Sequence, residues 1–370
     1  MDLASILLNS GLDTWLLIII SVALLGVGFV CLIKGADWFV DGAAGIAEKL
    51  RVPTLIIGLT VVSFGTSAPE LATSIISAAQ GGNGADIAIG NVIGSNITNI
   101  WLILGIAAVI CPLVVQKSAL RFDFPVLLGS SVLLLLLGGI DGKIGRVDGI
   151  IMFVISLAYM TFLVVYGVRE SKKQATMSAL NDHEVVQADL DKEKGFAGQE
   201  ESSWYKKMCK HTWFLILVTI VGLALVVAGA LFGVIPGAKV VATQIGIPEK
   251  VIGLTVVAIG TSLPELVTCI VAAKKGETDI AVGDIVGSNI FNIIRTLGLC
   301  AIIIPLPFAT SFWVDGIIAL LAAIMLAVFG YIKGHKVRRW AGIVMLVCFV
   351  LYYVYLFAFE GKVSAFLATL

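Results

Sequence analysis

Residues 58–79 read GLTVVSFGTSAPELATSIISAA, and residues 253–274 read GLTVVAIGTSLPELVTCIVAAK. These two stretches are identical at 14 of 22 positions. A second pair follows them, because ADIAIGNVIGSNITNI at 85–100 matches TDIAVGDIVGSNIFNI at 278–293 at 10 of 16 positions. Matches of this extent within one chain indicate an internal duplication, with one repeat at 58–100 and the other at 253–293.

The composition around these repeats is that of a membrane protein. Of the 370 residues, 59% are hydrophobic and 14% are charged, and the mean hydropathy is +1.03. Long apolar stretches without an alternating pattern predict an all-α protein that crosses a lipid bilayer. We expect ten transmembrane helices, at about 13–46, 53–80, 84–111, 118–138, 147–168, 211–246, 248–274, 278–304, 311–332 and 339–358.

Five of these spans lie in each half of the chain. Because five is an odd number, the second half must enter the membrane from the opposite face, so the two five-helix repeats are inverted. The expected halves are 1–168 and 211–370, and a polar linker at 169–210 joins them. Inversion brings the duplicated stretches together near the bilayer midplane, as in many secondary transporters.

The distribution of basic residues predicts the orientation in a cell (inner) membrane. One set of alternate loops holds most of them, namely Lys49, Arg51, Lys117, Arg121, Lys274, Lys275, the segment 333–339 and the linker. The positive-inside rule therefore predicts an outside N-terminus and a cytoplasmic linker. The first residues have no basic segment before the apolar run, so we expect no removable signal peptide. A net charge of zero gives no indication of a nucleic-acid partner.

Glu70 and Glu265 are acidic residues within apolar helices. A charge there costs roughly 2.5 kcal/mol or more, which predicts a functional role. Two hydroxyl residues precede each glutamate by about one helical turn, and they are Thr66 and Ser67 in the first repeat and Thr261 and Ser262 in the second. Carboxylate and hydroxyl oxygens suit hard cations such as Ca2+ and Na+. The sequence therefore predicts a cation site.

Proline and glycine predict a break in each of these helices. Pro69 and Pro264 lack the amide proton, and Gly65 and Gly260 lie four residues before them. Backbone carbonyls released at such a break lie at the C-terminal end of a half-helix, where the helix dipole favours a cation.

The GSN stretches supply neutral oxygens for the same site. Ser95 and Asn99 are four residues apart on one helix face, and Ser288 and Asn292 repeat this spacing. We expect these four side chains to complete the coordination shell. Asn96 and Asn289 fall on another face, and we expect them to brace the packing of the helices.

Several charged or polar residues have open roles. Asn91 and Asp284 lie near the entrance of their helices, and for Asp284 a vestibule or capping role is expected at least as much as ligation. Asp37 and Asp41 fit either a vestibule or the end of a helix. Arg295 falls within a span, and we favour a structural role for it.

At these motifs the chain resembles the cation/calcium exchanger superfamily, in particular the compact prokaryotic sodium/calcium exchangers. The resemblance rests on GTSAPE at 65–70, GNVIGSNITN at 90–99, GTSLPE at 260–265 and GDIVGSNIFN at 283–292. It implies ion sites formed by the second and third helices of each half. The metal ligands it implies are Glu70, Glu265, Thr66, Ser67, Thr261, Ser262, Ser95, Asn99, Ser288 and Asn292, with backbone carbonyls of Ser63 and Ala258. Some members have Asp at the position of Asn292, so a K+ requirement stays open.

The predicted function is exchange of Na+ for Ca2+ by alternating access. Ca2+/H+ exchange and K+-dependent Na+/Ca2+ exchange are the alternatives, and a passive channel is a further one. An enzyme with Ser67 or Ser262 as its nucleophile is disfavoured, because His183, His211 and His335 lie in loops or at a span edge. We expect no cofactor besides the transported ions, and the sequence leaves the oligomeric state open.

Overall fold

The structure is a computed structural model that describes residues 3–50, 52–80, 83–181, 212–244, 258–308, 310–332 and 334–367. Within these residues, eight helices are long and apolar enough to cross a membrane, and a bent pair of helices supplies a ninth. The remaining predicted span, 248–274, begins outside the described residues. Helices α14 (Ala258–Thr261) and α15 (Leu263–Lys275) form the rest of it. The helices thus follow the ten-span arrangement that the sequence predicts.

The first half contains five spans, preceded by the short helix α1 (Leu3–Leu8). The first span is α2 (Thr14–Leu50), and the second combines α3 (Thr54–Ile57), the π-helix η1 (Gly58–Val62), α4 (Ser63–Thr66) and α5 (Ala68–Gln80). The third combines α6 (Asn83–Ile97), the π-helix η2 (Thr98–Leu104) and α7 (Gly105–Ile110). The fourth is η3 (Ala119–Asp123) with α8 (Phe124–Ile140), and the fifth is α9 (Arg146–Asn181).

The second half repeats this order. Its first span is α11 (Thr212–Ala228), η5 (Gly229–Val234) and α12 (Ile235–Gln244). Helices α14 and α15 follow, and then α16 (Thr278–Phe291), η7 (Asn292–Leu297) and α17 (Gly298–Ile303). The last two spans are α18 (Thr310–Tyr331) and α19 (Arg339–Leu367).

The first part of the predicted polar linker is helical. Helix α9 continues without interruption to Asn181, so the first residues of the predicted 169–210 segment are helical. Long polar and charged side chains such as Lys172 and Lys173 are good helix formers, which explains why the helix extends beyond its apolar part. Residues 182–211, which contain the rest of the predicted linker, lie outside the described residues.

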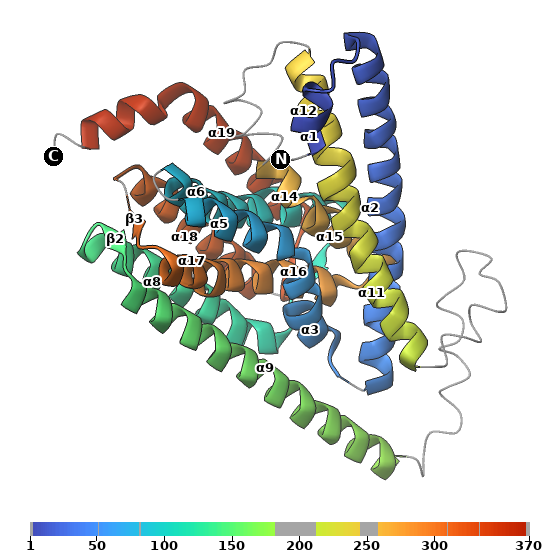
Figure 1. The fold of residues 1–370 in the computed structure, drawn as a ribbon. Coiled ribbons are helices and arrows are strands. Elements are labelled where there is room, and N and C mark those ends of the chain that lie inside the picture. The colour runs from blue at the N-terminus through green and yellow to red at the C-terminus, as the bar shows by residue number, and fades with distance from the viewer. Residues whose placement is uncertain are drawn as a thin grey trace.

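Helices α2 and α11 lie side by side along one flank of the molecule, next to a bundle formed by the other spans (Figure 1). Glycines of α2 bring the two backbones into contact. A Cβ added to Gly35 would lie 2.7 Å from the carbonyl oxygen of Gly222, and one added to Gly28 would lie 2.7 Å from the amide nitrogen of Val234. Small residues at such crossings allow close helix packing within a bilayer.

Two short strand pairs join loops of the first half to loops of the second. Strand β1 (Leu113–Val114) pairs with β4 (Lys336–Val337), and β2 (Lys143–Ile144) pairs with β3 (Leu306–Pro307), both antiparallel. In a ten-span topology the first pair falls on one membrane face and the second on the other. The pairing is therefore consistent with inverted halves.

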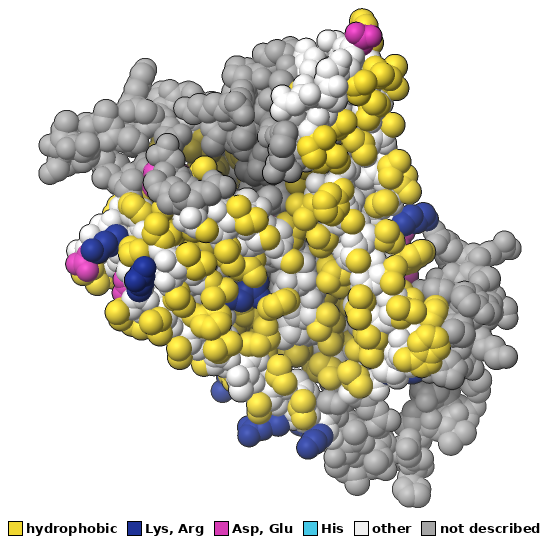
Figure 2. Space-filling view, in the orientation of Figure 1, with side chains coloured by type: hydrophobic (Ala, Val, Ile, Leu, Met, Phe, Trp, Pro, Cys, Tyr) yellow, Lys and Arg dark blue, Asp and Glu magenta, His cyan; other side chains and the backbone are white. Residues whose placement is uncertain are grey.

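Polarity is distributed as expected for a bilayer protein. Hydrophobic side chains cover most of the face shown in Figure 2, and Lys and Arg side chains lie mainly towards its edges. The centre of the molecule is instead rich in polar groups, because α16 is buried along almost its whole length and carries Asp284, Ser288 and Asn289. The polar residues of the repeats are thus enclosed within the bundle.

Candidate ion-binding site

Both motif helices break at the serine of the motif. Ser67 has φ −79° and ψ 7°, and Ser262 has φ −89° and ψ 7°, so neither residue continues the α-helix. In the first half the segments on either side of Ser67 are bent by 45°. The predicted break is confirmed, and Pro69 and Pro264 follow it at a position where a helix tolerates proline.

The two breaks bring the glutamates of opposite halves together. Glu70 and Glu265 are both 0% exposed. The Ser262 hydroxyl donates a hydrogen bond to Oε1 of Glu70 at 3.0 Å, and the Ser67 hydroxyl donates to Oε1 of Glu265 at 3.1 Å. Each glutamate thus accepts a hydrogen bond from the motif serine of the opposite half, which confirms that the two motifs face each other.

Buried oxygen atoms remain without donors in this cluster. Within the described residues they include Oε2 of Glu70, Oε2 of Glu265, Oδ1 of Asn99 and Oδ1 of Asn292. Buried acceptors are normally satisfied, because an unpaired polar atom away from water costs free energy. Carboxylate and amide oxygens are the ligands that Ca2+ and Na+ prefer, so this set fits a hard cation.

The amide nitrogens of the two asparagines are held by hydrogen bonds between the halves. Asn99 donates to Oδ1 of Asn289 at 3.0 Å, and Asn292 donates to the hydroxyl of Ser95 at 3.3 Å. Their oxygens therefore stay available. Asn99 and Asn292 also lie at the beginning of the π-helical segments η2 and η7, and such segments are frequent at functional sites.

Asn96 and Asn289 form the predicted brace. The amide nitrogen of Asn96 donates to the backbone oxygen of Asn289 at 3.2 Å, and the amide nitrogen of Asn289 donates to the backbone oxygen of Asn96 at 3.1 Å. This reciprocal pair ties α6 to α16. It also fixes the side-chain oxygen of Asn289 that holds Asn99.

The remaining predicted ligands lie in or beside the cluster. The hydroxyl oxygens of Ser67 and Ser288 are 2.8 Å apart, and Thr261 is buried one residue before Ser262. The carbonyl of Ser63 already accepts the amide of Ser67 at 3.2 Å. Ala258 begins α14, and the residues before it are outside the described part. Ligation by the Ser63 and Ala258 carbonyls stays a prediction.

Asp284 has a different environment from the one expected. It is 1% exposed and accepts hydrogen bonds from the hydroxyls of Thr66 at 2.9 Å, Thr268 at 3.0 Å and Ser288 at 3.4 Å. The N-cap of α16 is Glu277, seven residues earlier. The vestibule and capping interpretations of Asp284 are therefore wrong, because side-chain hydroxyls from both halves enclose it.

Arg295 is buried against aromatic rings. It is 6% exposed, and its guanidinium lies 4.4 Å from the ring centre of Phe64 and 5.0 Å from that of Phe291. Cation–π contact offsets part of the cost of burying this charge. The same position in the first repeat is Leu102, so the arginine belongs to the second half alone.

The C-terminal end of α15 is linked to α2 by an ion pair. The ammonium of Lys275 lies 2.7 Å from Oδ1 of Asp41 and 3.5 Å from Oδ1 of Asp37. Burial, followed by the negative charges of Asp279 and Asp41, raises the pKa of the neighbouring Glu277. Asp37 and Asp41 lie within α2, which continues to Leu50, so they are not at the end of their own helix, and a vestibule role stays a prediction.

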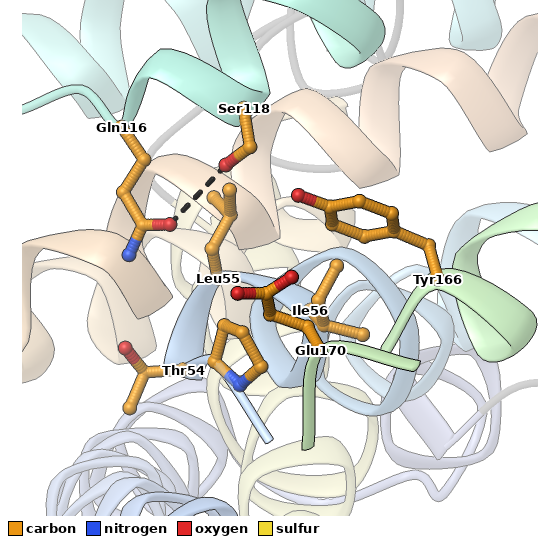
Figure 3. A pocket seen from close by; sticks show the side chains of 8 residues that line it. Thr54, Leu55, Ile56, Gln116, Ser118, Tyr166 and Glu170 are labelled. Carbon is orange, nitrogen blue, oxygen red and sulfur yellow. Dashed lines mark hydrogen bonds between the residues drawn. The ribbon is translucent and has the colours of Figure 1, made fainter. Parts of the chain in front are cut away.

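A separate cavity of about 280 Å³ lies at the N-terminal end of α3 (Figure 3). Its lining includes Thr54, Gln116, Ser118 and Glu170, and the Ser118 hydroxyl donates to Oε1 of Gln116 at 3.3 Å. The amide of Gln116 in turn donates to Asp279 at 2.6 Å. Neither motif glutamate lines this cavity, so it is distinct from the carboxylate cluster.

Comparison with known proteins identifies relatives along nearly the whole chain. The inner membrane protein YrbG of Escherichia coli K12 is 35% identical over 339 residues, which are 90% of this chain and 96% of YrbG. The sodium/calcium exchanger MaX1 of Methanosarcina acetivorans is 33% identical over 359 residues, which are 92% of this chain and 99% of MaX1.

The fold and the duplication agree with these relatives. A solved structure of the sodium-calcium exchanger NCX_Mj superposes with a TM-score of 0.73 at 31% identity and covers 91% of this chain and 98% of NCX_Mj. The family model described as sodium/calcium exchanger protein matches twice, at residues 20–165 and 214–358, once in each half. The chain therefore belongs to the sodium/calcium exchanger family.

Proposed function

We propose that this protein exchanges Na+ for Ca2+ across a membrane by alternating access. The observation that carries the proposal is the pair of buried glutamates, one from each inverted half, each hydrogen-bonded to the serine of the opposite motif. MaX1 and NCX_Mj are named sodium/calcium exchangers, which supports Na+ and Ca2+ as the exchanged ions.

The charge of the site explains why the ions are exchanged. Two carboxylates are neutralised by one Ca2+ or by two Na+, and neutral oxygens around them can hold further Na+. An empty site with two uncompensated charges is costly to enclose in a low-dielectric interior. The transition between the two faces therefore proceeds when ions occupy the site, which couples the two fluxes.

The proposed ligands are those of the motif resemblance. The donor-free oxygens of Glu70, Glu265, Asn99 and Asn292 form the centre of the site. Hydroxyl and carbonyl oxygens surround them, from Thr66, Ser67, Ser95, Thr261, Ser262 and Ser288 and from the backbones of Ser63 and Ala258.

The proposed conformational change is a displacement of α2 and α11 relative to the other spans. Backbone contact between Gly35 and Gly222 supports movement of these two helices as one unit. Side chains of α11 and of α12, which continues the same span, lie against the motif glycines, because a Cβ added to Gly65 would lie 2.5 Å from Leu223 and one added to Gly260 would lie 2.7 Å from Ile235. Displacement of the unit would thus act directly on the helix breaks.

The proposed orientation in a cell membrane places the N-terminus outside and the linker in the cytoplasm, as the basic loops indicate. The ion pair of Lys275 and the cavity near Gln116 then lie at the cytoplasmic end of the bundle. The proposed domain division keeps two five-helix halves, 1–168 and 211–370.

Ca2+ flux in proteoliposomes tests the exchange. An imposed Na+ gradient at fixed pH is expected to drive Ca2+ uptake, and Glu70→Gln or Glu265→Gln is expected to abolish it. Glu48→Gln, the same change on an exposed residue of α2, is the matched control and is expected to transport normally.

Gradients imposed one at a time separate the alternatives. Uptake that follows a pH gradient without Na+ would establish Ca2+/H+ exchange, and uptake that also requires K+ would establish K+-dependent exchange. Flux that needs no counter-ion would indicate a channel and overturn the proposal.

A further inference from the structure

Asp284 is a buried position beside the ion site at which the two halves differ in charge. The corresponding residue of the first repeat is Asn91, so a carboxylate stands in one half where an amide stands in the other. Asn91 is half-buried, and its amide donates to the hydroxyl of Ser74 at 3.0 Å. Asp284 is fully enclosed instead, and in the described part of the chain no basic side chain forms an ion pair with it.

The donors to Asp284 include two of the proposed ion ligands. Its Oδ1 accepts the hydroxyl of Thr66, which comes from the opposite half, and lies 3.4 Å from the hydroxyl of Ser288. Its Oδ2 accepts the hydroxyl of Thr268. Both carboxylate oxygens of Asp284 are therefore occupied, whereas Oε2 of Glu70 and of Glu265 are free of donors.

A hydroxyl that binds a cation has to present a lone pair to the ion. Its single proton must then point away from the ion, and in a dry interior that proton needs an acceptor on the far side. A carboxylate is a strong acceptor for this purpose, because hydrogen bonds to a charged group are shorter and stronger than neutral ones.

We propose that Asp284 is a positioning residue of the ion site, which accepts the hydroxyl protons of Thr66 and Ser288 so that their lone pairs face the ion. This inference rests on the proposed site. Asp284 acts through these hydroxyls and does not itself contact the ion. Ser288 extends the effect, since its oxygen lies 2.8 Å from the hydroxyl of Ser67, which is bound to Glu265.

An amide at position 284 should perform much of this task. Asn keeps one acceptor oxygen for Thr66 and Ser288, and its NH2 group can donate to Thr268, whose own proton has the backbone oxygen of Pro264 at 2.7 Å. Leucine has a similar shape but no acceptor, so Ser288 loses Asp284 as a partner and the Thr66 hydroxyl turns to the backbone oxygen of Val62 at 3.1 Å. The two substitutions thus separate proton acceptance from negative charge.

The experiment measures the KM for Ca2+ and the maximal rate of Na+-driven Ca2+ uptake in proteoliposomes. Asp284→Asn is expected to keep the KM within about threefold of the wild-type value, and Asp284→Leu to raise it by about tenfold or more, the equivalent of one lost hydrogen bond to a charged group. Thr268→Val is the control, because Thr268 contacts Asp284 but is not a proposed ligand, and its KM is expected to stay near the wild-type value.

A double-mutant cycle tests whether Asp284 acts through Thr66 and Ser288. In a Thr66→Val, Ser288→Ala background, Asp284→Leu is expected to add little to the KM, because its targets are already absent. Full additivity would overturn the proposal, and so would an unchanged KM in Asp284→Leu. If the leucine variant does not fold, Asp284→Asn alone tests the proposal. A rise of its KM by about tenfold would show that the negative charge matters and not proton acceptance, and would overturn the proposal. Absence of Na+-driven uptake in the wild-type protein would instead refute the exchanger function.

Discussion

Alanine at position 222 tests whether backbone contact holds α2 and α11 together. A Cβ at Gly222 would lie 2.5 Å from the amide nitrogen of Phe39 and 2.7 Å from the carbonyl oxygen of Gly35. Both atoms belong to the α2 backbone, so no rotamer change relieves the clash. Restoring an ordinary separation of about 3.5 Å requires the helices to part by about 1 Å. Overpacking of this kind costs about 3 kcal/mol.

Thermal unfolding of the purified protein in detergent measures this cost. Gly222→Ala is expected to lower the Tm by on the order of 5 °C. Gly26→Ala is the matched control, because Gly26 is also in α2 but has no neighbouring atom within 4 Å of an added Cβ. Alanine favours helix over glycine by about 1 kcal/mol, so the control is expected to keep or slightly raise the Tm. Equal Tm values for the two variants would refute the packing argument.

Two further substitutions probe polar contacts away from the carboxylate cluster. Lys275→Gln removes the positive charge that opposes the raised pKa of Glu277, so that pKa rises further. Because the folded state then favours protonated Glu277 more strongly, stability falls more as the pH rises through this pKa, and the Tm difference between about pH 5 and about pH 8 is expected to widen. An unchanged difference would contradict the assignment. Tyr159→Phe removes the donor that binds Asp123 at 2.7 Å and is expected to cost about 2 kcal/mol, measured as a lower Tm. In the Tyr159→Phe background, Asp123→Leu is expected to recover part of the lost stability, because it removes a buried carboxylate that has lost its donor. A further decrease of the Tm would contradict this explanation.

The features that the sequence predicted well are those that depend on local or duplicated patterns. The helix breaks at Ser67 and Ser262 follow from glycine and proline within a few residues, and the apolar runs determine the spans. The meeting of Glu70 and Glu265 could also be predicted, because an inverted duplication dictates that equivalent positions approach each other.

The features that the sequence did not predict depend on contacts between distant segments. The environment of Asp284 is set by Thr66, which lies 218 residues away, and no spacing rule connects the two. The aromatic surroundings of Arg295 likewise include Phe64 from the other half. The exact end of α9 at Asn181 could not be predicted, because hydropathy marks the end of a membrane span and not the end of a helix.

The strand pairs β1 with β4 and β2 with β3 have a mechanical consequence. Each pair fastens one half of the chain to the other near a membrane boundary, and the pseudo-symmetry of the halves exchanges the two pairs. The spans that contain α8 and α18 are therefore fastened at both ends, and the spans that precede and follow them at one end, whereas α2 and α11 adjoin no strand in the described residues. These six spans would form a frame that is fastened between the halves at both membrane faces, against which the proposed displacement of α2 and α11 would take place.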